Sequence, residues 1–101
     1  PTLTTGGREL TDGGRVPKGA QLALSVPDGT TVYYTLDGTD PRRRGGELNP
    51  AAVPYDAGRG IAVRKAGAIV VNARARDGKG VWSALESVSL TVNAGMVIML
   101  R

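Results

Sequence analysis

The amino-acid sequence predicts an all-β fold, a sandwich of about seven short antiparallel strands. The chain of 101 residues contains 15 glycines and 6 prolines, a density of turn residues that favours many short strands. Apolar residues recur at every second position in several stretches, which is the pattern of half-buried strands. These stretches follow one another at intervals of roughly 8–12 residues, and none shows the stripe of an amphipathic helix.

The chain divides into three segments. Residues 1–14 have few apolar positions and two Gly-Gly pairs, so we expect a lead-in or linker with a possible edge strand. Residues 15–93 have the alternating pattern and are expected to form the sandwich. Residues 94–101 contain the unbroken apolar run Met96–Leu100, which we interpret as an extra edge strand or the start of another element. An apolar strand with an unpaired edge also favours self-association.

We expect a β-hairpin formed by residues 20–26 and 31–36. Both stretches alternate in hydrophobicity, and Pro27-Asp28-Gly29 between them has the composition of a tight turn. The side chains expected to face the core are Leu22, Leu24, Val26, Val32, Tyr34 and Leu36. Those expected on the other face of the second strand are Tyr33, Thr35 and Asp37.

A long polar loop is expected over residues 42–54, where several Gly and Pro residues interrupt the chain. A short strand at 61–65 follows. Two longer strands come next, at 68–76 and 81–92, and the turn Asp77-Gly78-Lys79-Gly80 joins them as a hairpin. The side chains expected to face the core are Ile61, Val63, Ile69, Val71, Ala73, Ala75, Val88, Leu90 and Val92.

The stretch 33–42 combines a strand with a tight turn. It reads Tyr-Tyr-Thr-Leu-Asp-Gly-Thr-Asp-Pro-Arg. Asp37 and Gly38 suit a tight turn because Gly38 tolerates a positive φ, Asp40 can close an Asx-turn, and Pro41 ends the strand ladder. We therefore assign these four residues to a structural turn.

The same stretch resembles the hallmark of the chitobiase/β-hexosaminidase C-terminal-type domain. Two further matches follow in the family's order. They are the segment from Arg44-Gly45-Gly46-Glu47 through Asn49-Pro50 and Ala52 to Tyr55, and the segment from Val71-Asn72-Ala73-Arg74-Ala75 to Trp82-Ser83. The chain departs from the family at residues 55–61, where the loop is longer and lacks the family's proline. The resemblance extends over residues 15–92.

The resemblance implies an immunoglobulin-like or fibronectin-type-III-like sandwich that is a non-catalytic accessory module. Known members accompany glycoside hydrolases or repeat in bacterial surface proteins. The resemblance therefore implies a larger exported bacterial protein that is extracellular, at the cell surface or periplasmic. The expected function is a spacer or structural brace whose partners are neighbouring domains. The alternatives are a carbohydrate-binding module for cell-wall or environmental polysaccharide, and self-assembly through Met96–Leu100.

Tyr33, Tyr55 and Trp82 are the candidate sugar-stacking residues. A sugar site of this kind needs exposed, coplanar rings with polar neighbours. The competing interpretation is that a chain without phenylalanine uses its few aromatic rings for packing. The positions of the three rings distinguish the two interpretations.

Several classes of function are not expected. The chain has no cysteine and no histidine, which excludes thiolate nucleophiles, disulfides and Cys or His metal ligands. The acidic residues lie mostly in turns beside Gly or Pro, not in the apolar setting of a glycosidase acid, so we expect no catalytic residue and no cofactor. Asp37 and Asp40, even joined by Glu47 and Asp56, lack the spacing of a known calcium loop, so we expect no metal site.

The net charge of +4 and the run Arg42-Arg43-Arg44 could indicate a polyanion site, but we interpret the run as a solvated turn. Arg74 and Arg76 share a strand face without the interleaved aromatic residues that single-strand binding favours, so we expect no nucleic-acid partner. No apolar run reaches the length of a membrane span, and no signal peptide is present, so we expect no membrane insertion. We interpret the chain as a piece of a longer protein whose targeting segment lies elsewhere.

Overall fold

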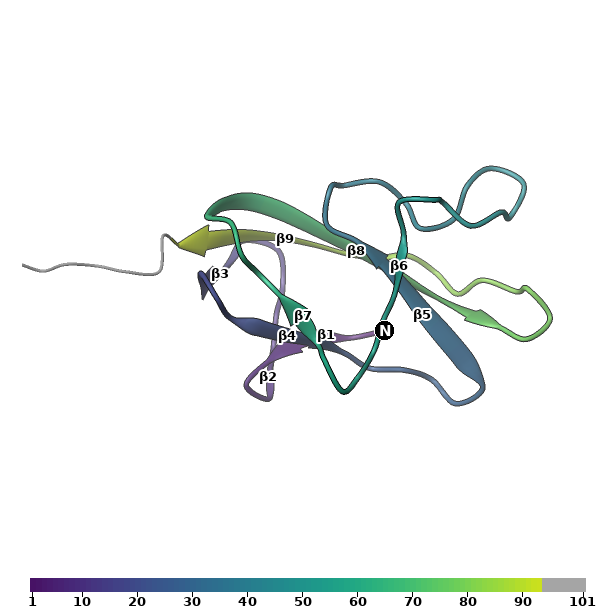
Figure 1. The fold of residues 1–101 in the computed structure, drawn as a ribbon, viewed down its shortest axis with the longest axis horizontal. Helices are drawn as coiled ribbons and strands as arrows, with labels where there is room; N and C mark the ends of the chain where they lie inside the picture. Colours follow the sequence, from purple (N-terminus) through teal and green to yellow (C-terminus); the bar gives the residue numbers. More distant parts are fainter. Residues whose placement is uncertain (94–101) are drawn as a thin grey trace, which may run out of the picture.

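Residues 1–93 form nine β-strands in two sheets in the computed structural model, which describes this part of the chain. The four-stranded sheet has the order β2-β1-β4-β7, and the five-stranded sheet has the order β3-β9-β8-β5-β6 (Figure 1). The strands are β1 (Leu3–Thr5), β2 (Arg8–Glu9), β3 (Gly14–Pro17), β4 (Gln21–Leu24), β5 (Thr30–Thr35), β6 (Val53–Pro54), β7 (Ile61–Ala62), β8 (Gly67–Asp77) and β9 (Glu86–Asn93). The predicted all-β sandwich is confirmed.

No helix long and apolar enough to cross a membrane is found among residues 1–93. The predicted strand or element at Met96–Leu100 lies outside the described residues.

Aliphatic side chains from both sheets form one core. The period of two in β9 turns Val88, Leu90 and Val92 inward, and none of them is more than 3% exposed. The predicted inner face of β9 is therefore confirmed. On β8, Val71, Ala73 and Ala75 are buried as predicted, and Ile69 is partly buried against the core. Buried partners from the rest of the core are Leu3, Leu10, Val16, Leu22, Leu24, Val32, Ile61, Val63, Val71, Ala73 and Ala75.

Residues 1–14, expected to be a lead-in with a possible edge strand, lie within the sandwich. β1 pairs with β4, and Leu3 stands opposite Leu24. Leu3 is 0% exposed and Leu10 is 2% exposed, so both leucines belong to the core. The few apolar positions of this segment are thus enough to attach it to the four-stranded sheet.

The predicted hairpin between residues 20–26 and 31–36 is wrong. β4 pairs with β1 and β7 in one sheet, whereas β5 pairs with β8 and β6 in the other. The turn at Pro27 therefore crosses between the sheets, closed by hydrogen bonds from the backbone nitrogen and Oγ1 of Thr30 to the Pro27 carbonyl. This turn chemistry redirects the chain but does not choose the pairing partner. Val26, expected in the core, is 43% exposed on this crossing.

The end of β5 also differs from the prediction. Leu36, expected inside, is 36% exposed, and Thr35, expected outside, is 3% exposed. Thr35 is buried because the chain after β5 folds back over it, and its hydroxyl donates a hydrogen bond to the Thr39 carbonyl. A loop that covers a sheet face can bury a polar side chain when it supplies the acceptor.

One strand pair in the larger sheet is parallel, although the prediction was of antiparallel strands only. β3 lies beside β9 in a register that runs from Gly14 opposite Leu90 to Pro17 opposite Asn93. Backbone hydrogen bonds extend the pair at both ends, from Gly13 to the Ser89 carbonyl (2.9 Å) and from Lys18 to the Asn93 carbonyl (3.1 Å). An early strand is thereby joined directly to the last described strand.

Candidate functional site

The outer face of the five-stranded sheet gathers polar and aromatic side chains from β5 and β8. The two strands place Thr31 opposite Arg76, Tyr33 opposite Arg74, and Thr35 opposite Asn72. These positions alternate with core positions such as Val32, so their side chains point away from the core. We call this surface the outer face.

The loop after β5 lies over part of the outer face. Asn72 Nδ2 donates hydrogen bonds to the carbonyls of Gly38 (3.0 Å) and Thr39 (2.9 Å), and Asn72 is only 4% exposed. Pro41, which belongs to this loop, is fully buried. Gly38 has a φ of +85°, a left-handed conformation that glycine adopts without strain and that aims its carbonyl at the sheet.

An ion pair fixes the same loop to β8. Arg74 Nε donates to Asp40 Oδ1 at 2.8 Å, and Arg74 Nη2 donates to Asp40 Oδ2 at 2.9 Å. The third nitrogen, Nη1, donates to the Ser83 carbonyl at 2.8 Å. The hydrogen bonds from Arg74 hold the pKa of the Asp40 carboxyl below its ordinary value, helped by the backbone N–H of Arg42 and opposed by partial burial.

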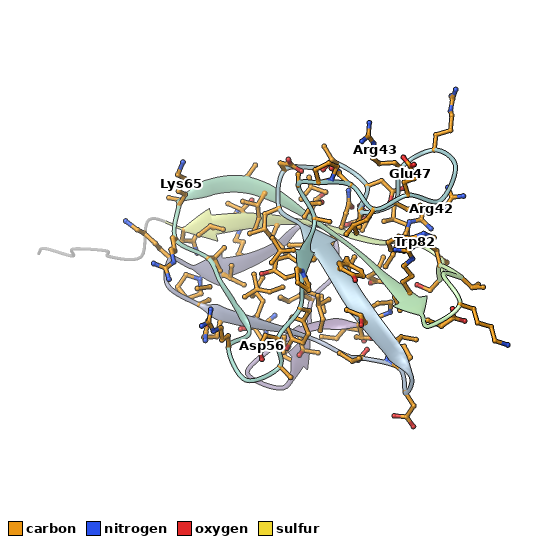
Figure 2. The ribbon with its side chains drawn as sticks, turned by 45° about the vertical axis from the view of Figure 1, so that its right-hand side comes forward. Arg42, Arg43, Glu47, Asp56, Lys65 and Trp82 are labelled. Carbon is orange, nitrogen blue, oxygen red and sulfur yellow. The ribbon has the colours of Figure 1, made fainter. Side chains whose placement is uncertain are left out.

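The carboxylate of Asp37 is engaged within the turn. Its Oδ1 accepts hydrogen bonds from the Thr39 hydroxyl (2.6 Å) and the Thr39 backbone N–H (3.0 Å), which lower the pKa of Asp37. Asp37, Gly38, Asp40 and Pro41 thus lie in one turn held by local bonds. Among residues 1–93 no group of three or more acidic side chains could hold a metal ion. Figure 2 shows Glu47 and Asp56 on different loops, far from each other.

Trp82 lies on the outer face where the β8–β9 connection meets the long loop. Its Nε1 donates to the Gly46 carbonyl at 2.8 Å. The Arg76 guanidinium carbon lies 5.0 Å from the centroid of the indole, and the Tyr33 ring centroid lies 5.9 Å away with a tilt of 58° between the planes. Figure 2 labels Trp82 and Glu47, which follows the acceptor Gly46 in the long loop.

Tyr55 lies elsewhere. Its ring packs edge-on against Tyr34, with centroids 6.4 Å apart and planes at 73°, and both rings contact the core. Its backbone N–H donates to the Val32 carbonyl at 2.7 Å. The structure therefore brings Tyr33 and Trp82 together and leaves Tyr55 apart, and the tilted pair is not a flat strip of rings.

The comparison with known families agrees with this architecture. A family model described as the chitobiase/beta-hexosaminidase C-terminal domain matches residues 11–87. The chain belongs to this family. Its members are immunoglobulin-like, non-catalytic accessory modules. No curated protein and no solved structure matches the chain.

In this member of the family, Arg76 lies on the outer face, and the sequence pointed to it only as part of a nucleic-acid surface that was not expected. It lines a cleft of about 540 Å³ together with Tyr33 and residues of the turn that follows β8. Its spacing from Trp82 in the sequence could have indicated this position. Arg76 and Trp82 flank the tight turn that begins at Asp77 and stand opposite each other across it. A residue pair that flanks a tight turn lies side by side on a sheet.

The run Arg42-Arg43-Arg44 is exposed on the loop. The backbone N–H of Arg42 donates to Asp40 Oδ1 (2.9 Å), and that of Arg43 donates to the Glu47 carbonyl (2.7 Å). Figure 2 shows the Arg43 side chain pointing away from the sheet. This geometry is that of a solvated turn whose backbone is held and whose side chains are free.

Proposed function

We propose that this domain is a non-catalytic accessory module that spaces or braces neighbouring domains of a larger exported bacterial protein. The non-catalytic character of its family supports the proposal. A brace must keep its shape when the chain on either side is pulled. The observation that supports this role most is the parallel pairing of β3 with β9.

The direction of these two strands decides how they respond to tension. Tension applied between the start of β3 and the end of β9 makes the two strands slide past each other along their length. All hydrogen bonds between them are then loaded at the same time, whereas an antiparallel pair pulled in this way opens one bond after another. The β3–β9 pair is thus suited to resist tension applied along these two strands. A pull on the chain before β1 first meets the pairing of β1 with β4.

The bonds of the outer face support the same role. Asp40 with Arg74, Asn72 with the loop carbonyls, and Trp82 with Gly46 join the longest loop to the sheet. A loop held in this way adds rigidity to the sandwich. Sugar stacking by Tyr33, Tyr55 and Trp82 together is not favoured, because Tyr55 packs against Tyr34 and away from the other two.

The experiment is single-molecule force spectroscopy on the chain pulled through cysteine handles at Thr11→Cys and Asn93→Cys, which apply the force to the start of β3 and to the end of β9. The variant Asp12→Ala removes the carboxylate whose Oδ1 accepts the Ser89 backbone N–H (2.9 Å) at the start of the β3–β9 pair. We expect a clear unfolding peak for the parent chain and a lower rupture force for Asp12→Ala. The control Asp28→Ala removes an equal charge in the crossing turn and should leave the force unchanged. An unfolding force too low to detect would contradict the brace.

A further inference from the structure

Beyond a bracing role, we propose that the cleft beside Tyr33 and Arg76 binds the oxyanion of an acidic polysaccharide, a carboxylate or a sulfate ester. The cleft measures about 540 Å³, and sites for small ligands usually enclose about 300–1,000 Å³. Its walls come from the crossing turn before β5, from β5 itself and from the turn after β8. The cleft is therefore formed by regular sheet and tight turns, which position its side chains.

Arg76 brings to this cleft a charge that no carboxylate of the described chain neutralises. The ion pairs found among residues 1–93 join Asp40 with Arg74 and Asp56 with Arg59, and Arg76 takes part in neither. Its Nε is buried without a hydrogen-bond partner, so a ligand in the cleft meets the two terminal nitrogens, Nη1 and Nη2. A guanidinium with unused donors binds oxyanions well, because its planar fork matches the two oxygens of a carboxylate or sulfate.

The guanidinium of Arg76 is also held in place before any ligand arrives. Its central carbon lies 5.0 Å from the centroid of the Trp82 ring, within reach of a cation–π attraction. On another side it approaches Gly80, where an added Cβ would lie 3.6 Å from Arg76 Nη2. Gly80 has a φ of +86°, so a larger residue is disfavoured there. A side chain that is already ordered loses less entropy on binding.

The other residues of the cleft suit an anionic sugar. Lys79 adds a second cation, and Asp77 is the single acid in the lining. The Oδ1 atom of Asp77 is occupied by the backbone N–H groups of Lys79 (2.8 Å) and Val81 (2.9 Å). Tyr33 offers a ring surface beside the cations, and aromatic rings of this kind combine apolar contact with a polar hydroxyl.

The size of the charged surface favours a polysaccharide over a nucleic acid. Affinity for nucleic acids depends on several phosphate contacts and, for single strands, on successive stacking rings. The cleft has two cations and one ring, and Arg74 on the same face is already paired with Asp40. Two cations and one ring suit the binding of a single acidic sugar unit of the polymer in the cleft.

The test is a titration of the 101-residue chain followed by the emission of Trp82, the single tryptophan of the sequence. The probes are polygalacturonate, which bears carboxylates, dextran sulfate, which bears sulfate esters, uncharged dextran, and a single-stranded DNA oligonucleotide. We expect one of the two acidic polymers to change the emission and to bind at least about tenfold more tightly than dextran. The polymer that does so identifies the oxyanion.

Two variants decide whether the binding occurs in the cleft. Arg76→Gln should weaken binding of the acidic polymer by about tenfold or more, whereas Arg8→Gln should change it by less than about twofold. Arg8 is exposed on β2 of the other sheet, so the control removes the same charge elsewhere. If Arg76→Gln does not fold in a thermal-melt check, Lys79→Gln replaces it with the same expected direction. The proposal is overturned if neither acidic polymer binds, if both variants lose affinity equally, or if DNA binds as tightly.

Discussion

Asp40 and Arg74 meet in a two-point ion pair although they are 34 positions apart in the sequence. Two hydrogen bonds of 2.8 and 2.9 Å join the carboxylate on the loop to the guanidinium on β8. The side chain of Arg74 is 18% exposed and that of Asp40 is 37% exposed, so the pair is partly shielded from water. The pair fixes the turn that contains Asp37, Gly38, Asp40 and Pro41 to the sheet. This contact is the physical reason for an acidic side chain at position 40.

We predict that Asp40→Asn destabilises the domain by about 1–2 kcal/mol, because Arg74 then keeps its position without a charged partner. The measurement is urea unfolding followed by Trp82 emission. Asp28→Asn, which removes the same charge from the exposed crossing turn, is the control and should lie within about 0.5 kcal/mol of the parent chain. Equal effects of the two substitutions would show that the ion pair contributes nothing to the free energy of unfolding.

The same pair predicts a loss of stability in acid. The folded-state pKa of Asp40 lies below its ordinary value of 3.8, so the unfolded chain takes up the proton first as the pH falls. The contribution is complete above about pH 5 and is lost as the pH falls through the folded-state pKa. Asp37, whose pKa is lowered by Thr39, acts in the same direction.

The free energy of unfolding measured at intervals from about pH 6 down to about pH 3 checks this. The decline should be shallower for Asp40→Asn than for the parent chain, because the substituted side chain no longer titrates. Curves that run parallel over the whole range would contradict the assignment.

A third prediction concerns the two carbonyls bound by Asn72. Asn72→Asp places a carboxylate against the carbonyl oxygens of Gly38 and Thr39, so it should release the loop and cost about 2 kcal/mol or more. The arginine run of residues 42–44 makes the release measurable, since trypsin cleaves after arginine in an open loop. Cleavage there should be faster than in the parent chain. Thr91→Ala, at an exposed position of β9 opposite Ala68, should leave the rate as it is, and an unchanged rate in Asn72→Asp would refute the role of Asn72.

A fourth prediction tests whether residues 1–14 belong to the folding unit. Leu3 is 0% exposed in the core, so Leu3→Ala should cost about 2–5 kcal/mol through the cavity that it leaves. Leu85 is 39% exposed, and Leu85→Ala should cost less than about 1 kcal/mol. Thermal and urea unfolding give both values. If Leu3→Ala changed the free energy of unfolding by less than about 1 kcal/mol, residues 1–14 would behave as a linker and not as part of the folding unit.

The sequence pattern was sufficient for the inner faces of the long strands and insufficient for their partners. Val88, Leu90 and Val92 alternate with polar residues, and a strand that packs one face on a core must turn such residues inward. Pro27-Asp28-Gly29, by contrast, suits a hairpin and a crossing between sheets equally. The outcome depends on which distant strands pair with β4 and β5. The residues of the turn carry no information about those partners.

The site shows the same limit. Asp40 was recognised as a turn residue from its neighbours, but its pairing with Arg74 and not with Arg76 depends on the path of the loop over the sheet. This path also decides that Arg76 keeps a free charge next to Trp82. Tyr55 could not be separated from Tyr33 and Trp82 by residue type, since the face on which a ring lies follows from strand register.

The measurement that tests the bracing role most directly compares two directions of pulling on the β3–β9 pair. The chain has no cysteine, so thiol handles can be introduced freely. Handles at Thr11→Cys and Asn93→Cys load the parallel strands from opposite ends, whereas handles at Thr11→Cys and Leu85→Cys pull them apart from the same end. Rupture under force reports the unfolding barrier along the pulled direction. We expect a several-fold higher force for the first pair of handles, and equal forces in the two directions would contradict a domain built to carry tension through these strands.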